Sequence, residues 1–173
     1  ERMRHLLEGL GHPESQYPVV LVGGTNGKGS VVEFLTNILR VAGYKTGTYT
    51  SPHLWRYNER IRINGCDISE EEMGELLDRI GPHVEVARHD PSLGDITEFE
   101  ILTLLAFLYF AEKKIDIAVL EVGLGGRWDA TNVSNPLVSV ITHVALDHTD
   151  RLGNDFVSIA REKIPILRSG GVL

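Results

Sequence analysis

Short runs of β-branched and other apolar residues recur along the chain, and they predict strands at residues 19–22, 44–49, 117–120 and 137–142. Between these runs, apolar residues return every three or four positions, which is the spacing of amphipathic helices. Strands that alternate with helices in this way indicate an α/β fold, in which a largely parallel sheet is flanked by helices.

Two helices are predicted most clearly. Residues 99–111 are apolar nearly all round, which is typical of a buried helix. Residues 31–42 are followed by Gly43, a common helix stop. The apolar face expected for this second helix consists of Val31, Phe34, Leu35, Ile38, Leu39 and Ala42.

Further elements are indicated by local signals. Ser69 precedes three glutamates, which predicts a capped helix start with acidic residues in its first turn. Residues 155–167 predict a last helix that is broken near Pro165. Residues 60–65 alternate and end on Asn-Gly, which predicts a small hairpin.

A glycine-rich segment joins the first predicted strand to the helix that follows it. Such a turn directs backbone N–H groups to one spot at the positive end of the helix dipole, and this suits a polyphosphate. Lys28 adds a positive charge for the outer phosphates, and Ser30 adds a hydroxyl that can reach a metal ion. The candidate phosphate-binding residues are Gly24, Thr25, Asn26, Gly27, Lys28, Gly29 and Ser30.

The spacing of this segment departs from the common phosphate loop. Only three residues separate Gly23 from Gly27, and Gly29 stands between Lys28 and Ser30. The usual pattern has four residues between its glycines and places Ser or Thr directly after Lys. A glycine-rich turn without a ligand is therefore the alternative.

Composition narrows the class of protein. The 173 residues suffice for one domain with a core, and the hydrophobic fraction of 42% is that of an ordinary globular protein. The net charge of −7, without a basic stripe interleaved with aromatic residues, argues against a nucleic-acid partner. One cysteine, no membrane-length apolar run and no signal peptide favour a cytoplasmic protein without a membrane partner.

The two ends of the chain suggest a truncated domain. The sequence opens without an initiator methionine, already in a helical pattern, and residues 170–173 resemble a turn that leads into a strand. We therefore expect residues 1–173 to form one domain that is truncated at both ends, with an incomplete sheet.

The chemically interesting loops all follow predicted strands. They lie at residues 50–53, 121–126 and 145–148. Because ligands of open α/β sheets bind beyond the carboxyl ends of the strands, one sheet edge should present a lysine, hydroxyls, a carboxylate and an imidazole.

Five ordered motifs carry a family resemblance. They read GTNGKGS (residues 24–30), TSPHLWRYNERIRING (50–65), LEVGLGGRWDATN (120–132), ALDHTDRLG (145–153) and REKIPILR (161–168). Together they resemble the folylpolyglutamate synthase and dihydrofolate synthase family of the Mur ligase superfamily. The resemblance implies that residues 1–173 are an ATP-binding domain of the Mur ligase central type, without its C-terminal domain. It also implies an ATP- and Mg²⁺-dependent amide ligase that joins L-glutamate to dihydropteroate or a folate through an acyl phosphate.

The resemblance also implies residue roles. Residues 27–30 match ATP phosphate contacts, Ser51 and Glu121 match metal ligands, and His148 matches a ligand of a second Mg²⁺. Lys163 matches a lysine that the family can carbamylate, so Lys28, His148 and Lys163 are the expected catalytic residues. The residues that match a pterin pocket are Thr97, Glu98, Phe99, Glu100, Trp128, Asp129 and Ala130.

Each of these residues also has a structural interpretation. Ser51 before a proline could shape a turn, and an isolated helical lysine such as Lys163 is usually solvated. Residues 164–166 read Ile-Pro-Ile where the family usually has Ala-Gly-Ile, which could shift Lys163. Arg60 and Arg127 lie inside motifs but receive no separate role. The other histidines are interpreted as packing (His143) or as surface or structural residues (His5, His12, His83 and His89).

Two other functions remain open at this stage. One is a Mur-type ligase that acts on a peptidoglycan precursor, although residues 50–54 and 58–61 favour the folate type. The other is a nucleotide-binding module without catalysis. The sequence also leaves open which of the two folate reactions the protein performs.

Overall fold

The computed structural model describes residues 1–168, and the predicted onset of a strand at residues 170–173 lies outside them. Six strands form one sheet in the order β4-β3-β2-β5-β1-β6. The strands are β1 (Val19–Gly23), β2 (Thr46–Tyr49), β3 (Ile61–Ile63), β4 (Cys66–Asp67), β5 (Ile117–Glu121) and β6 (Val138–Ile141). The four strands predicted from apolar runs are thereby confirmed, with ends that differ by one or two residues.

The sheet is parallel in its centre and antiparallel at one edge. Strand β1 pairs in parallel with β5 and β6, and β5 pairs in parallel with β2. The predicted hairpin, β3 and β4, adds to β2 in antiparallel fashion. Its turn, Asn64 and Gly65, has positive φ at both residues, as a tight two-residue hairpin requires. The sheet is therefore largely parallel, as predicted, with a mixed edge.

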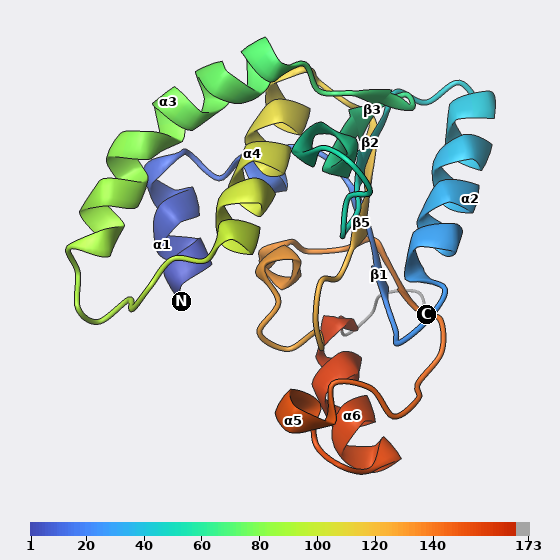
Figure 1. Ribbon diagram of the computed structural model, residues 1–173. Coiled ribbons are helices and arrows are strands. Elements are labelled where there is room, and N and C mark those ends of the chain that lie inside the picture. The colour runs from blue at the N-terminus through green and yellow to red at the C-terminus, as the bar shows by residue number, and fades with distance from the viewer. Residues whose placement is uncertain (169–173) are drawn as a thin grey trace.

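Helices cover both faces of the sheet (Figure 1). One face carries α1 (Arg2–Gly9), α3 (Glu70–Arg88) and α4 (Glu98–Glu112), and the other carries α2 (Lys28–Val41). Helix α4 is buried nearly all round, as predicted, because it lies between the sheet and α3. Its side chains form the main core with α1, α3 and one face of the sheet.

Helix α2 buries less of its apolar face than the sequence predicts. Val32 is fully buried against the sheet, with Leu35 and Leu39 packed beside it. Phe34, Ile38 and Ala42 are exposed, so half of the predicted apolar face is not buried in the described part of the chain. They lie on the flank of the helix, because the sheet contacts only the narrow stripe around Val32, Leu35 and Leu39.

Capping residues begin two of the helices on the core side. Ser69 caps α3 and Thr97 caps α4, and in each case a glutamate three residues later completes a capping box. The predicted start of α3 is thereby confirmed. Each cap satisfies backbone N–H groups that the first helical turn cannot pair, which fixes where the helix begins.

The chain after β6 forms two short helices, α5 (Thr149–Leu152) and α6 (Phe156–Lys163), at the edge where β1 and β5 end (Figure 1). Asp155 caps α6, and a 3-10 turn at Ile164–Ile166 follows it. The predicted break near Pro165 is confirmed. The remaining 3-10 turns are η1 (Pro13–Ser15), η2 (Tyr57–Arg60) and η3 (Ala130–Val133).

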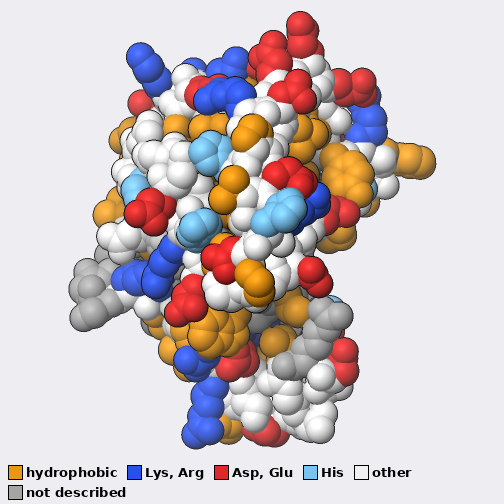
Figure 2. Space-filling model, turned by 90° about the vertical axis from the view of Figure 1, so that its left-hand side faces the viewer, with side chains coloured by type: hydrophobic (Ala, Val, Ile, Leu, Met, Phe, Trp, Pro, Cys, Tyr) orange, Lys and Arg blue, Asp and Glu red, His pale blue; other side chains and the backbone are white. Residues whose placement is uncertain are grey.

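The surface agrees with the mixed charge of the sequence. Figure 2 shows basic and acidic side chains interspersed over the face formed by α1 and α3. In the described part of the chain, no helix is both long and apolar enough to span a bilayer.

The buried position of α4 can be tested with a leucine pair. Leu104 has no exposed surface, whereas Leu54 is 86% exposed in a loop. We expect Leu104→Ala to lower the free energy of unfolding by about 2–5 kcal/mol, because it removes apolar contacts and leaves a cavity. Leu54→Ala should change it by less than about 0.5 kcal/mol. Urea unfolding measures both, and equal effects would contradict the packing described.

Candidate functional site

A cleft of about 820 Å³ opens at the carboxyl edge of the sheet. Its walls come from the glycine loop after β1, the loop after β2, the loop after β5 and the segment that leads into α5. The sequence-predicted residues among those lining it are Thr25, Lys28, Ser51, Thr97, Phe99, Glu100, Trp128, Asp129, Ala130 and His148. The predicted meeting of these loops at one edge is thereby confirmed.

The glycine loop turns directly from β1 into α2. Gly27 is the N-cap residue of α2, with φ of 82°, and it offers no capping side chain. The first N–H groups of α2 therefore keep their capacity for an outside acceptor, at the positive end of the helix dipole. This geometry favours an anion, as the sequence pattern predicts.

Gly24 is where the loop passes closest to β6. A Cβ atom at Gly24 would lie 2.0 Å from Oγ1 of Thr142, and φ at Gly24 is 142°. The Thr142 hydroxyl donates to the carbonyl of Asn26 at 2.8 Å, and Thr25 N–H donates to the carbonyl of His143 at 2.6 Å. The loop is therefore held against the end of β6, and only glycine fits at this point.

Two lysines reach the inner side of this loop. Lys28 Nζ donates to the carbonyls of Gly24 (3.2 Å) and Thr25 (3.0 Å). Lys163 Nζ donates to the same Gly24 carbonyl at 3.0 Å. The two positive charges thus lie at one turn of the backbone.

Lys163 is only 4% exposed, so it is not the solvated helical lysine of the structural alternative. Burial lowers the pKa of its amine, and the charge of Lys28 lowers it further, whereas Asp147 opposes the shift. The 3-10 turn that begins at Ile164 continues the chain without moving Lys163 out of the site.

Glu121 ends β5 with a buried carboxylate, 5% exposed. Oε2 accepts a hydrogen bond from the backbone N–H of Ser51 at 3.1 Å. Burial raises the pKa of this carboxyl group, and the Ser51 amide and the Lys28 charge oppose the rise. A Cβ at Gly29, in the first turn of α2, would lie 3.8 Å from Oε2, so glycine there leaves space beside the carboxylate.

His148 lies across the cleft at the start of α5. Its side chain is exposed and its Nε2 lies 3.7 Å from a carboxylate oxygen of Asp147. It lines the same cleft as Ser51, although no direct contact joins it to Ser51 or Glu121. The predicted metal ligands thus form a contacting pair, Ser51 and Glu121, and a separate His148 that lines the same cleft as Ser51.

Residues 1–168 contain no cluster of three His, Cys, Asp or Glu side chains that could hold a metal ion by themselves. Magnesium, however, commonly takes one or two protein ligands and completes its shell with phosphate oxygens and water. A buried carboxylate beside a serine and a phosphate-type loop fits this kind of shared site.

Residues of the segment Thr97–Glu100 have two roles, because some cap helix α4 and Phe99 packs against the loop after β5. Thr97 and Glu100 form the capping box of α4, and Glu100 Oε1 also accepts from Arg2 Nε at 2.8 Å. The ring of Phe99 lies where a side chain at Gly123 would be, since a Cβ there would come within 2.6 Å of it. Glu98 is exposed and accepts from the Tyr57 hydroxyl at 3.2 Å, outside the cleft lining.

The residues of the segment 128–130 also differ in burial and in role. Trp128 is 85% exposed and lines the cleft, whereas Asp129 and Ala130 are buried. The Asp129 carboxylate accepts from the N–H groups of Gly123, Leu124 and Thr131. Burial raises its pKa against these hydrogen bonds. Asp129 therefore shapes the loop after β5, and Trp128 offers the larger free surface.

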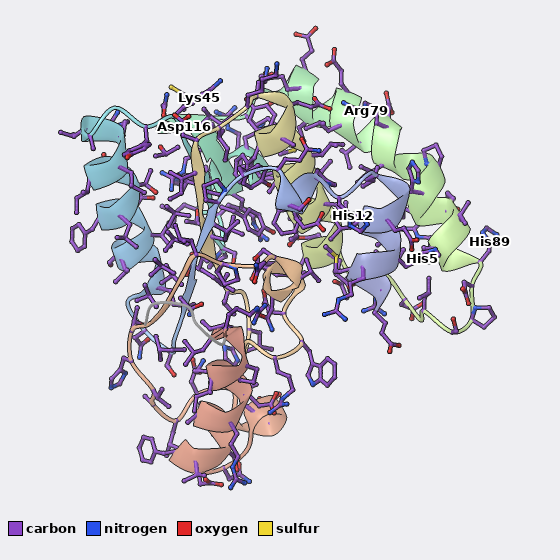
Figure 3. The ribbon with its side chains drawn as sticks, turned by 180° about the vertical axis from the view of Figure 1, so that it is seen from behind. His5, His12, Lys45, Arg79, His89 and Asp116 are labelled. Atoms are coloured by element: carbon purple, nitrogen blue, oxygen red, sulfur yellow. The ribbon has the colours of Figure 1, made fainter. Side chains whose placement is uncertain are left out.

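Four further histidines, His5, His12, His83 and His89, lie away from this cleft. Figure 3 shows His5, His12 and His89 on the side of α1 and α3, and all three are exposed. His83 is half-buried against Gly9. These residues agree with the surface or structural interpretation. The prediction that the His143 side chain packs is wrong, because the side chain is exposed and only the backbone of His143 holds the glycine loop.

The structure adds cleft residues that the sequence analysis did not assign. Arg2, Arg60 and Asp147 line the cleft, and Thr142 supports the glycine loop from behind. Arg60 and Asp147 lie inside the family motifs, but the sequence analysis assigned no role to either residue. Arg2 is an ordinary helical arginine in the sequence, and only the fold brings it here.

A glycine loop after the first strand of a parallel sheet, with a buried carboxylate at the neighbouring strand end, defines a P-loop type α/β domain. A family model described as the Mur ligase middle domain matches residues 22–170, and the chain belongs to this family.

Individual relatives support the same family membership. The dihydrofolate synthase/folylpolyglutamate synthase of Bacillus subtilis is 50% identical over 170 residues, which cover 98% of this chain and 39% of that protein. A structure of E. coli FolC in complex with DHPP and ADP has 45% identity and a TM-score of 0.90, covering 99% of this chain and 40% of its own. An FPGS–AMPPCP–folate complex has 40% identity and a TM-score of 0.93, and the match covers 99% of this chain and 42% of the chain in that complex. The chain thus spans about two fifths of the length of these relatives.

The buried carboxylate generates a stability prediction. Because the pKa of Glu121 is raised in the folded state, that state binds more protons than the unfolded chain above about pH 4.5. Stability from this group is therefore present at low pH and lost as pH rises through the raised pKa. Glu121→Gln should remove this loss, so the variant should be at least as stable as the unsubstituted chain at pH 7.

Urea unfolding from pH 4 to 8, without divalent cations, measures this difference. Glu98→Gln is the matched control, because Glu98 is an exposed carboxylate. A Glu121→Gln variant that loses stability at pH 7 would show that the ionised carboxylate is a structural element.

Proposed function

We propose that the protein containing this chain is an ATP-dependent amide ligase. It adds L-glutamate to a pteridine-bearing carboxylic acid, dihydropteroate or a folate, through an acyl phosphate. The observation that carries the proposal is the continuity of one cleft. The same space is lined by Lys28 of the phosphate-type loop and by the aromatic rings of Phe99 and Trp128. A triphosphate and a flat aromatic acid could therefore lie end to end.

The similarity to proteins whose complexes hold ADP, AMPPCP, DHPP or folate supports this assignment. The chain spans about two fifths of such proteins, so the reaction is proposed for a protein that also has the counterpart of their remaining length. A peptidoglycan-precursor ligase is the less favoured alternative, because the named relatives are folate-type enzymes. The single exposed cysteine, Cys66, fits a cytoplasmic setting.

The first task of this chain is to bind the nucleotide. The N–H groups at the start of α2 receive phosphate oxygens, and Lys28 moves from the loop carbonyls to the outer phosphates. A carboxylate is a poor acyl donor, and its phosphorylation requires two anionic groups to approach each other. The loop amides and the lysines lower the cost of that approach.

The second task is to hold a divalent cation. Ser51 and Glu121 are the proposed ligands beside the phosphates, and His148 is proposed for a second cation across the cleft. When bound, magnesium supplies charge neutralisation for the phosphate oxygens. Ser51 N–H fixes the orientation of the Glu121 carboxylate, and Gly29 leaves space for a cation shell next to it.

A third task is closure around the intermediate. An acyl phosphate hydrolyses in water, so the glutamate amine has to reach it in a site from which water is excluded. The cleft is partly open, and we propose that the part of the protein beyond this chain covers it and supplies most of the glutamate site.

The proposed function is tested with the full-length protein, ATP, magnesium, dihydropteroate and glutamate, with the amide product measured by mass. We expect product only when all components are present. Lys28→Ala should lower the turnover at least about a hundredfold, because one preorganised charge contact is commonly worth about 3 kcal/mol in the transition state. Lys45→Ala is the control, since Lys45 lies near the amino ends of the strands with Asp116 (Figure 3).

Near-normal turnover of Lys28→Ala would contradict the phosphate-loop role. ATP hydrolysis without any requirement for the pteridine acid would favour the nucleotide-binding module instead. The same mixture with the 173-residue chain alone should give no product, because the glutamate site is proposed to lie elsewhere.

Lys163 gives a further prediction within this function. Its lowered pKa leaves more neutral amine, whose nitrogen can attack carbon dioxide, form an N–C bond and release a proton. The resulting carbamate is an anion that can hold a cation. We expect activity to fall in bicarbonate-free buffer and to recover when bicarbonate is added. An unmodified mass of the intact protein in native mass spectrometry, together with no bicarbonate effect, would contradict the prediction.

A further inference from the structure

Arg60 is the cleft arginine whose charge has no close carboxylate partner. Its side chain is 11% exposed, and the contact between its Nη2 and Oε1 of Glu98 is 4.0 Å, too long for a hydrogen bond. Arg2, by contrast, contacts Glu100 at 2.8 Å. In the part of the chain that the structure describes, Arg60 is thus a largely buried cation with a loose ion pair at the rim.

The orientation of Arg60 is fixed from one side only. Its Nε donates to Nδ1 of His53 at 2.9 Å, and its guanidinium carbon lies 5.6 Å from the centre of the Tyr57 ring. The rings of His53 and Tyr57 pack at 4.5 Å between centroids. These contacts use the Nε atom and one face of the group, and leave the Nη edge available.

The loop that carries His53 is itself held in place. The Glu59 carboxylate accepts hydrogen bonds from three consecutive backbone N–H groups, those of residues 54, 55 and 56. The carbonyl of Arg60 accepts from Thr50 N–H at 3.0 Å, which ties the arginine to the end of β2. His53 and Arg60 are therefore attached to one rigid turn beside Ser51.

The place of Arg60 in the cleft defines what it can bind. It lines the same cleft as Lys28, Ser51 and Phe99. The charge of Arg60 opposes the rise that burial causes in the pKa of Tyr49. Tyr49 packs against Phe99 at 5.8 Å between ring centroids. An acid whose aromatic part lies near Phe99 would place its carboxylate near Arg60 and Lys28.

We propose that Arg60 binds the carboxylate of the acid substrate and holds it beside Lys28, and that His53 positions Arg60 for this contact. The planar fork of a guanidinium matches the two oxygens of a carboxylate, which an ammonium group cannot do. The inference rests on the proposed function, since it requires an aromatic acid in the cleft.

The test compares two ligands, dihydropteroate and its carboxamide, which differ only in the charge of the reacting group. Binding of both to the full-length protein is measured by calorimetry for the unsubstituted protein and for Arg60→Met, Arg60→Lys and Arg56→Met. Arg56 is the matched control, because it is an exposed arginine in the same loop whose ion pair with Glu70 is 3.6 Å long.

We expect the unsubstituted protein and Arg56→Met to bind the acid about tenfold or more tightly than the amide. Arg60→Met should lose this preference while its affinity for the amide stays unchanged, which also shows that the variant folds. Arg60→Lys should keep only part of the preference. His53→Leu should raise KM for the acid without a change in KM for ATP, and His53→Asn, which retains an acceptor, should restore it.

An unchanged preference in Arg60→Met would overturn the inference. An equal loss of affinity for both ligands would also overturn it, because the arginine would then only support the cleft. If the unsubstituted protein binds neither ligand, the proposed function fails first. That result is distinct from a protein that binds both ligands but discriminates between them without Arg60.

Discussion

The close approach of the backbone at Gly24 to the end of β6 is the constraint on which the site depends. A side chain at Gly24 would collide with Thr142, so the loop after β1 can lie against β6 only with glycine there. The same turn directs the Gly24 carbonyl at the amines of Lys28 and Lys163. Residues far apart in the sequence are thereby brought to one peptide unit.

Two cations at one carbonyl, beside a buried carboxylate, form an arrangement that is costly for the folded chain. Burial lowers the pKa of Lys163 and raises that of Glu121, so each charged form is less stable here than in water. Such pairs of opposed shifts are common where a site binds charged ligands. The cost is understandable if phosphate and a divalent cation complete the site.

Much of the fold could be predicted from local signals. The β-branched runs located the four parallel strands, the Asn64-Gly65 turn located the hairpin, and Ser69 located the start of α3. The exposure of Phe34 and Ile38 could not be predicted, because periodicity shows which residues share a helix face and not how wide a stripe the sheet contacts. The position of the hairpin at the edge next to β2 depends on long-range pairing and has no local signal.

The candidate site was predicted in part. The strand-end rule predicted that Lys28, Ser51 and Glu121 lie at one sheet edge, and the structure confirms this. Lys28 and Ser51 line the cleft, and the Glu121 carboxylate accepts a hydrogen bond from Ser51 N–H. The roles assigned to these residues stay predictions. The sequence could not show which polar side chains are already engaged in hydrogen bonds within the fold. Thr97, Glu100 and Asp129 make caps and loop contacts, whereas Arg60 has its Nη edge available.

The central claim is that the first turn of α2 binds the phosphates of ATP. The most direct measurement is the change in backbone amide chemical shifts when Mg·ATP is added to the isotope-labelled protein. The account predicts the largest changes at residues 27–30, with smaller changes at Ser51 and Glu121, and none at exposed α3 residues such as Val86. Saturable ATP binding that leaves residues 27–30 unshifted would contradict it.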